Sequence, residues 1–280
     1  MKNKNEESIV THLISFIKDL LKYWYLLVIS LAITLGAALF YVKYAAKKYK
    51  VKASVVINIE RNNAYGSASD NLLRVDELIE QEKNLQNEMF YFSSSPLISS
   101  VVEEMDLLVS YYLQEDKIPK QAEFSMKDLY GNAPFIIIPN KNHLQAVNTF
   151  FYIQILDEER FFISATNNEA MIVDYGDGKV VEESIYFSLS GQFNFSEQIE
   201  NGFTSFRVVL NSNYDSESYQ GKDLFFKFNT VSNLTTQFKQ SLSIEASSID
   251  ATVVEMSFNT DNVQKGVDFL DGLIDQYIQN

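Results

Sequence analysis

The chain has 280 residues, of which 37 are acidic and 23 basic, and its formal net charge at pH 7 is −14. Cysteine is absent, which excludes thiol catalysis, disulfide bonds and thiolate metal ligands. Nine basic and three acidic residues lie up to Lys52, so 14 basic and 34 acidic residues follow it, a net charge of −20. Such an acidic segment repels phosphate backbones and predicts no nucleic-acid partner.

Residues 1–22 form a leader whose apolar residues recur at helical spacing. Ser8 fits the N-cap of a helix, and the apolar positions after it are Ile9, Val10, Leu13, Ile14, Phe16, Ile17, Leu20 and Leu21. The pattern predicts a cytoplasmic amphipathic helix that either lies in the membrane interface or continues the membrane helix that follows. Both alternatives bury the same apolar face.

A charge-free run of twenty residues, 23–42 (YWYLLVISLAITLGAALFYV), follows the leader. At about 1.5 Å of rise per residue, a helix of this length spans roughly 30 Å, the thickness of a bilayer's hydrocarbon core. The run is longer than the apolar part of a signal peptide, although cleavage after Ala46 is an alternative. No apolar run of comparable length follows, so the sequence predicts a single retained transmembrane helix.

Aromatic and basic residues mark both ends of this run. Amphipathic rings prefer the headgroup layer, and lysines contact anionic headgroups. The predicted membrane-anchor residues are therefore Tyr23, Trp24, Tyr25, Tyr41, Tyr44, Lys43, Lys47 and Lys48. The last three belong to a basic juxtamembrane collar, residues 43–52. A count of lysines alone slightly favours an outside N-terminus, but that rule weakens for long translocated domains.

Residues 53–280 are predicted to form a mixed sheet-and-helix domain, which gives an α+β fold class. Alternation at 49–60 predicts a strand, and 61–70 reads as a polar loop. A helix is expected from Asp70 and a second one from Ser93–Pro96, the latter carrying apolar residues as far as Leu108. Strands are expected at 135–138, 149–156, 160–165, 179–189, 205–210, 222–229, 242–246 and 251–258.

The end of the chain carries a further helical pattern. Thr260 or Asp261 is the expected N-cap, and Val263, Val267, Leu270, Ile274 and Tyr277 form the apolar face. The pattern runs to Asn280 without a stop signal, which predicts a truncated gene product or a partial sequence.

Few residues offer chemistry. His143 is the only histidine after the membrane run, and it lies in a polar loop. No P-loop and no GxGxxG motif is present. The turn 174–179 (DYGDGK) lacks the spacing of a calcium loop and favours a hairpin. The acids at 157–159 and 182–183 fit solvated faces better than a glycosidase pair. The sequence therefore predicts no catalytic residue, metal site or cofactor.

Several segments carry a resemblance to a known family. They are LKYWYLLVIS with the membrane helix, YKVKASVVI at 49–57, the segment LQNEMFYFSSSPLISSVVEEMDLLVSYY at 85–112, DLYGNAPFIII at 128–138, and SLSIEASSIDATVVEMSFNTDNVQKGVDFLDGLIDQYIQ at 241–279. Together they are similar to the chain-length determinant family, the polysaccharide co-polymerases of Wzz type. Within it they look like the exopolysaccharide-transport branch, whose complete members resemble Wzc tyrosine autokinases.

This resemblance implies a scaffold in a bacterial inner membrane rather than an enzyme. Members of the family place a periplasmic sheet-and-helix domain between two membrane helices and assemble into homo-oligomeric rings. With a polysaccharide polymerase and an outer-membrane export protein they set the length of a polysaccharide chain. The second membrane helix and the P-loop kinase domain of complete members are absent from these 280 residues.

Two other functions fit the same pattern. A single-pass extracytoplasmic sensor or binding module would share the anchor and the acidic domain, although the 22-residue leader has no room for a signalling region. An anchored glycan hydrolase would need only two carboxylates.

Overall fold

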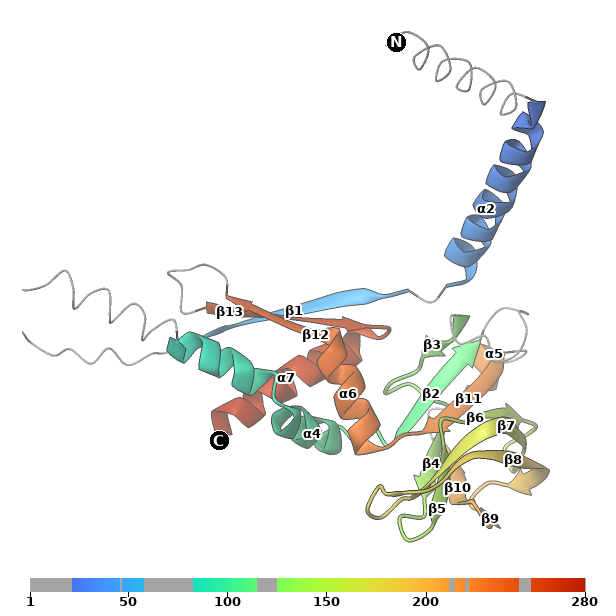
Figure 1. Ribbon diagram of the computed structural model, residues 1–280. Coiled ribbons are helices and arrows are strands. Elements are labelled where there is room, and N and C mark those ends of the chain that lie inside the picture. The colour runs from blue at the N-terminus through green and yellow to red at the C-terminus, as the bar shows by residue number, and fades with distance from the viewer. Residues whose placement is uncertain are drawn as a thin grey trace, which may run out of the picture. The chain divides into compact units, whose positions relative to one another are not determined.

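The computed structural model describes residues 22–45, 47–57, 83–114, 125–211, 215–219, 222–246 and 253–279 (Figure 1). The chain divides into two compact units, residues 1–45 and 46–280. An apolar helix lies in the first, and a mostly sheet domain with some helices forms the second, which agrees with the predicted α+β class. The predicted leader helix, the predicted loop at 61–70 and the start of the helix predicted from Asp70 lie outside the described residues; residues 83–92 are helical.

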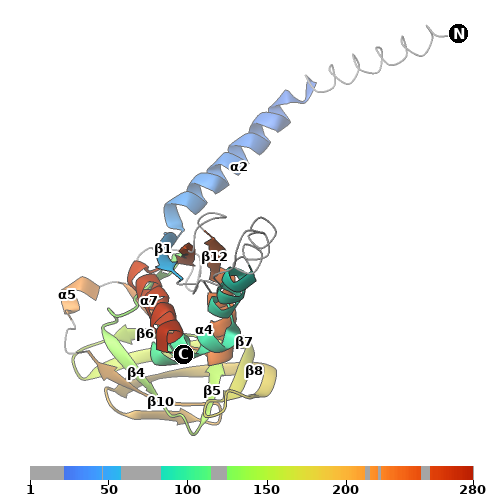
Figure 2. The ribbon, with the colours of Figure 1, turned by 90° about the vertical axis from the view of Figure 1, so that its left-hand side faces the viewer.

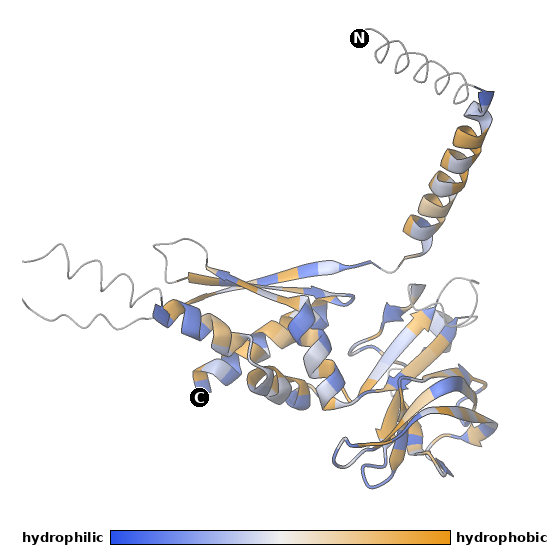
Figure 3. Cartoon of the chain, in the orientation of Figure 1, coloured by the Kyte–Doolittle hydropathy of each residue, from blue (hydrophilic) through white to orange (hydrophobic). Residues whose placement is uncertain are grey.

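Helix α2 (Trp24–Tyr44) covers most of the predicted membrane run and extends two residues beyond it. None of its residues is buried, and Figure 3 shows apolar residues along its length. Among the described residues it is the one helix long and apolar enough to span a membrane.

The second unit contains two hydrophobic cores, and we call the parts built around them the helical lobe and the sheet lobe. The helical lobe consists of β1 (Tyr49–Val56), the helix at 83–92, α4 (Ser95–Glu104), α6 (Val231–Ser241), β12 (Leu242–Ala246), β13 (Val253–Thr260) and α7 (Val263–Gln279). Its three strands form an antiparallel sheet in the order β1-β13-β12. Helices α6 and α7 cover one face of this sheet, and α4 packs on both helices (Figures 1 and 2).

The core of the helical lobe centres on three rings from three elements. Phe238 of α6, Phe258 of β13 and Phe269 of α7 have ring centroids 4.6–5.1 Å apart. Alternation along β13 turns Val254, Met256 and Phe258 to the helices, which is the period-2 pattern expected of a half-covered sheet.

Two helix boundaries correct the sequence prediction. Helix α4 ends at Glu104 rather than reaching Leu108, because Asp106 adopts φ 48°, outside the helical region. The N-cap of α7 is neither Thr260 nor Asp261. The Asn262 side chain accepts a hydrogen bond from the Lys265 N–H at 3.2 Å, while Thr260 Oγ1 accepts one from the Asn262 N–H.

The sheet lobe is inserted between α4 and α6. It contains β2 (Val109–Gln114), β3 (Lys127–Asp128), β4 (Phe135–Pro139), β5 (Leu144–Val147), β6 (Phe150–Ile155), β7 (Arg160–Asp174), β8 (Val180–Asn194), β9 (Gln198–Asn201), β10 (Thr204–Leu210), the short helix α5 (Ser216–Tyr219) and β11 (Asp223–Phe228). The larger sheet has the order β3-β2-β11-β5-β7-β6, with β8 paired to β7. Strand β11 also pairs with β6, so β11, β6, β7 and β5 form a closed circuit.

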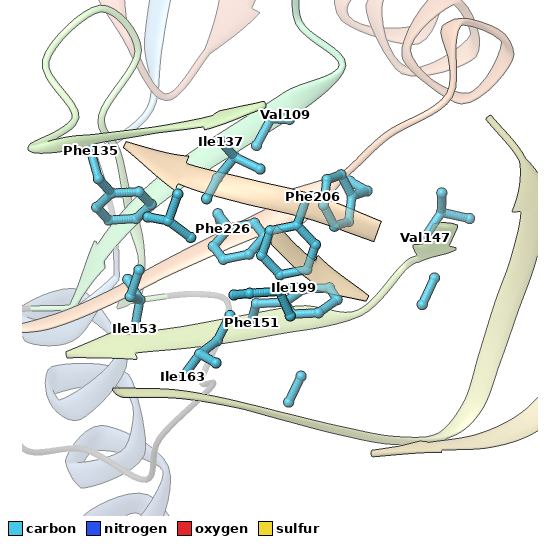
Figure 4. Close-up of a cluster of buried hydrophobic side chains, with 14 of the residues drawn as sticks. Val109, Phe135, Ile137, Val147, Phe151, Ile153, Ile163, Ile199, Phe206 and Phe226 are labelled. Carbon is cyan, nitrogen blue, oxygen red and sulfur yellow. The ribbon is translucent and has the colours of Figure 1, made fainter. Parts of the chain in front are cut away.

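A second sheet, in the order β4-β10-β9, packs on this circuit. Phe151 of β6 stacks on Phe226 of β11 at 4.8 Å between ring centroids, and Phe206 of β10 meets both rings edge-on (Figure 4). The buried amide of Gln145 ties β5 to β10, because its Oε1 accepts a hydrogen bond from the Thr204 hydroxyl at 2.6 Å. The two sheets therefore share one core.

Strand β4 is an edge of its sheet, and its free side is protected. The Ile137 N–H donates to the Tyr111 hydroxyl at 2.9 Å, and Pro139, two residues on, has no N–H to offer. A blocked edge of this kind resists pairing with a strand from another chain. Burial raises the pKa of Tyr111 to about 12.

We predict that Tyr111→Phe destabilises the chain by about 1–2 kcal/mol, because the buried Ile137 N–H loses its acceptor. A tyrosine with a raised pKa in the folded state stabilises fully below about pH 10 and loses this contribution as the pH rises toward 12. The variant should therefore lose less stability between pH 8 and 11 than the wild type does. Denaturant unfolding of the full chain in detergent measures both effects; equal stability and equal pH slopes would contradict them.

Candidate functional site

The structure places the predicted aromatic anchor residues at the two ends of α2. Trp24, Tyr25 and Tyr41 are exposed on the helix, Tyr23 precedes its first residue, and Tyr44 is its last residue. The Lys22 Nζ lies 5.5 Å from the Tyr23 ring centroid, and the Lys43 Nζ lies 5.1 Å from that of Tyr44. Each end thus carries an aromatic ring with a cation over it, an arrangement compatible with a headgroup layer.

The predicted basic collar, residues 43–52, is divided among three environments. Lys43 belongs to α2, Lys47 and Lys48 lie between α2 and β1, and the two remaining lysines are exposed on β1. Lys48 forms an ion pair with Asp261, just before α7. The collar is therefore partly built into the second unit.

The chain passes between the two lobes at residues 105–109 and 228–231, and hydrogen bonds fix this crossing. The Asn229 Nδ2 donates to the Leu107 carbonyl at 3.0 Å and to the Ser110 hydroxyl at 2.8 Å. The Tyr175 hydroxyl donates to the Leu108 carbonyl at 2.7 Å. Burial raises the pKa of Tyr175, so it remains a neutral donor.

A second set of contacts joins the lobes through β3 and α7. Asp128 and Lys265 form an ion pair at 2.9 Å, with side chains 7% and 14% exposed. The Tyr130 N–H donates to the other Asp128 oxygen, and the Tyr130 hydroxyl donates to Asp268 at 2.8 Å. Burial and the Asp268 carboxylate raise the pKa of Tyr130 to about 12. We call these four residues the interlobe latch.

A cleft of about 730 Å³ lies between α4, the first turns of α6 and two turns of the sheet lobe. Its walls carry six serine and threonine side chains: Ser95, Ser99, Thr230, Ser232, Thr235 and Thr236. Leu108 and Tyr175 of the lobe crossing contribute apolar surface, and Glu103, Lys141 and Asp177 supply the charges. We call this feature the interlobe cleft.

The charges around the interlobe cleft are few and partly compensated. Asp177 pairs with the Lys179 Nζ at 2.5 Å, and this hydrogen bond lowers the pKa of the Asp177 carboxyl. Glu103 and Lys141 are exposed and of opposite sign. The surface is therefore polar with little net charge, suited to hydrogen bonding rather than to binding a strong anion or cation.

The residues that the sequence offered as candidates for catalysis or metal binding lie in separate turns and loops of the structure. The hairpin at 174–179 is confirmed: the Gly178 N–H bonds to the Asp174 carbonyl at 2.8 Å with Gly178 at φ 70°. Asp157 accepts the Arg160 N–H at 2.7 Å in a turn of its own, and His143 Nδ1 lies 2.9 Å from the Leu144 carbonyl oxygen. Within the described ranges, no three histidine or acidic side chains are grouped for a metal ion.

Sequence reasoning did not find the interlobe cleft, because α6 forms part of its wall and was not predicted. A signal for α6 is present: Thr230 accepts the Asn233 N–H as an N-cap, and Leu234 and Phe238 follow at helical spacing. The class that the geometry defines is an α+β domain joined to a helix able to span a membrane. Comparison of the sequence with protein-family models and with curated proteins finds no match to either.

We predict that Asn229→Ala destabilises the chain by about 2–3 kcal/mol, because two side-chain hydrogen bonds are lost and the buried Leu107 carbonyl keeps no side-chain donor. Asn233→Ala, at an exposed position four residues on, is the matched control and should change stability by less than about 0.5 kcal/mol. Denaturant unfolding of the full chain compares them. Equal midpoints for the two variants would show that Asn229 does not fix the crossing.

Proposed function

We propose that the chain is a membrane-anchored scaffold of the polysaccharide co-polymerase type. It sets the chain length, or assists the export, of a capsular polysaccharide or exopolysaccharide in a bacterial inner membrane. The segments 49–57, 85–112 and 241–279, which resemble that family, lie far apart in the sequence but fall mainly in one folded part, the helical lobe. This coincidence is the observation that carries the proposal.

The connection between α2 and the helical lobe supports the same function. Four residues, 45–48, join the helix to β1, and β1 pairs along its whole length with β13. The tether thus continues directly into the sheet that organises the lobe. A scaffold held in this way searches for its partners in two dimensions, so modest contacts between copies suffice for assembly.

The proposal places the main domain in the periplasm and the leader in the cytoplasm. A net charge of −20 beyond Lys52 keeps the domain from lying on anionic lipid, while the lysines beside α2 contact the headgroups. The partners are further copies of the chain, a polymerase, an outer-membrane export protein and the polysaccharide itself. No catalytic step is assigned to the domain.

The interlobe cleft favours a second candidate, a single-pass extracytoplasmic binding module. Such a module would need the anchor and the cleft but would not alter polymer length. The two candidates therefore separate in one genetic experiment.

We predict that deleting the gene abolishes the modal length distribution of the surface polysaccharide, and that the full chain supplied in trans restores it. Gel electrophoresis of the extracted polymer measures the distribution. An unchanged distribution in the deletion strain would contradict the co-polymerase proposal and favour the binding module.

The anchor can be tested within the same experiment. Leu31→Arg with Leu35→Arg places two charges near the middle of α2, each costing roughly 2.5–3.5 kcal/mol on insertion. We expect this variant to leave the membrane fraction and to fail in restoring polymer length. Leu31→Ala with Leu35→Ala is the control, and it should remain in the membrane fraction and restore the distribution. Restoration by the arginine variant from the soluble fraction would refute a membrane-anchored function.

A further inference from the structure

We propose that the interlobe cleft binds a stretch of neutral polysaccharide. The inference rests on the proposed function and extends it, because it names the surface that contacts the polymer and the chemical class of that polymer. It is carried by the hydroxyl groups, the charge and the fixed floor of the cleft.

Hydroxyl groups line the cleft in two rows, one on each of two packed helices. Ser95 and Ser99 are four residues apart on α4, and Ser232 and Thr236 are four residues apart on α6, so each pair lies on one helical face. Each hydroxyl can both donate and accept a hydrogen bond, which matches the hydroxyls of a sugar.

Several of these groups retain hydrogen-bonding capacity. No other described residue engages the hydroxyls of Ser99 and Ser232. Thr230 Oγ1 accepts from the Asn233 N–H and keeps its own proton, while Thr236 Oγ1 donates to the Ser232 carbonyl and keeps its lone pairs. Thr235, only 8% exposed, has an Oγ1 without a partner in the described structure. The hydroxyls of Ser99, Thr230, Ser232 and Thr236 therefore have capacity to pair with a polyhydroxylated ligand.

Charge selects a neutral polymer over an anionic one. The cleft contains one lysine, Lys141, against the acids Glu103 and Asp177. The segment beyond Lys52 carries a net charge of −20, so a polyanion would be repelled before it reached the walls. A neutral glycan is not repelled by this charge.

The floor and the size of the cleft suit a short run of sugar rings. Pro96, Leu108, Tyr175 and Val231 supply apolar surface for the C–H faces of the rings. The bonds of Asn229 and Tyr175 hold the floor in place, so little ordering entropy is lost on binding. A volume of about 730 Å³ lies within the range of roughly 300–1,000 Å³ typical of ligand sites.

The test measures binding of the full chain in detergent by affinity electrophoresis. The probes are dextran, a linear β-1,3-glucan and the neutral fraction of surface polysaccharide from the encoding bacterium, with oligogalacturonate as the acidic probe. We expect retardation by at least one neutral probe and none by oligogalacturonate. Ser99→Ala with Ser232→Ala should weaken binding roughly tenfold, as expected for two lost hydrogen bonds.

Ser232→Trp fills the cleft from an exposed position and should abolish binding, whereas Asn233→Trp, its exposed neighbour outside the cleft, should bind as the wild type does. Failure of all three neutral probes, equal binding by both tryptophan variants, or preference for oligogalacturonate would overturn the inference. These outcomes are independent of the proposed function: an altered polymer length in the deletion strain without glycan binding rejects the cleft alone. The reverse outcome is glycan binding that Ser232→Trp blocks, together with a polymer length that the deletion leaves unchanged. It would support the binding site in the cleft and reject the co-polymerase function.

Discussion

The pairing of β1 with β13 is the constraint on which the second unit depends. All eight residues of β1 have partners on β13, from Tyr49 opposite Thr260 to Val56 opposite Val253. The paired positions are about 200 residues apart in the sequence, so closing this sheet costs loop entropy, which the pairing itself and the core of the helical lobe help to offset. Helix α7 approaches closely here, because a Cβ on Gly266 would lie 2.7 Å from the nearest Val51 side-chain atom. Strand β1 is thus a structural part of the helical lobe.

The sheet lobe is organised differently, since several of its strand pairs join near neighbours in the chain. The hairpin of β7 and β8 is closed by the turn at Gly178, and β6 pairs with β7 across a short connection. Local pairing of this kind forms at lower entropic cost than the β1–β13 sheet. Strand β11 is the exception, since it pairs with β2 and β6 across about 70–120 residues, and its Phe226 stacks on Phe151 of β6.

Much of the secondary structure could be predicted from the sequence where apolar and polar residues alternate along a strand or where a helix begins at a recognisable residue such as proline. Strands β4, β6, β10, β11 and β12 agree with the prediction to within a residue or two, and α4 begins beside Pro96 as expected. Strand β7 was predicted to end at Ala165, yet it runs to Asp174. Polar residues such as Asn167, at a register shift in the pairing of β7 with β8, interrupt the alternation that would have predicted the second half. Helix α6 was not predicted because its serines and threonines are typical of a loop, and the interlobe cleft was missed with it. Hydrophobic periodicity predicts helices and strands, but it does not predict that polar side chains of two lobes will line a shared cleft.

On α7, the interlobe latch lies close in the sequence to the ion pair of Lys48 with Asp261. Lys265 and Asp268 belong to the first two turns of α7, a few residues after Asp261, which pairs with Lys48. Losing either partner of the Asp128–Lys265 pair would leave a charge in a site less than one-sixth exposed, a far larger cost than losing a surface pair. The lobes are thus held at a fixed spacing on the α7 side and by Asn229 and Tyr175 at the crossing. Asn229 and Tyr175 also line the interlobe cleft, so this side of the cleft is held by hydrogen bonds that form without a ligand, and binding there would order few additional groups.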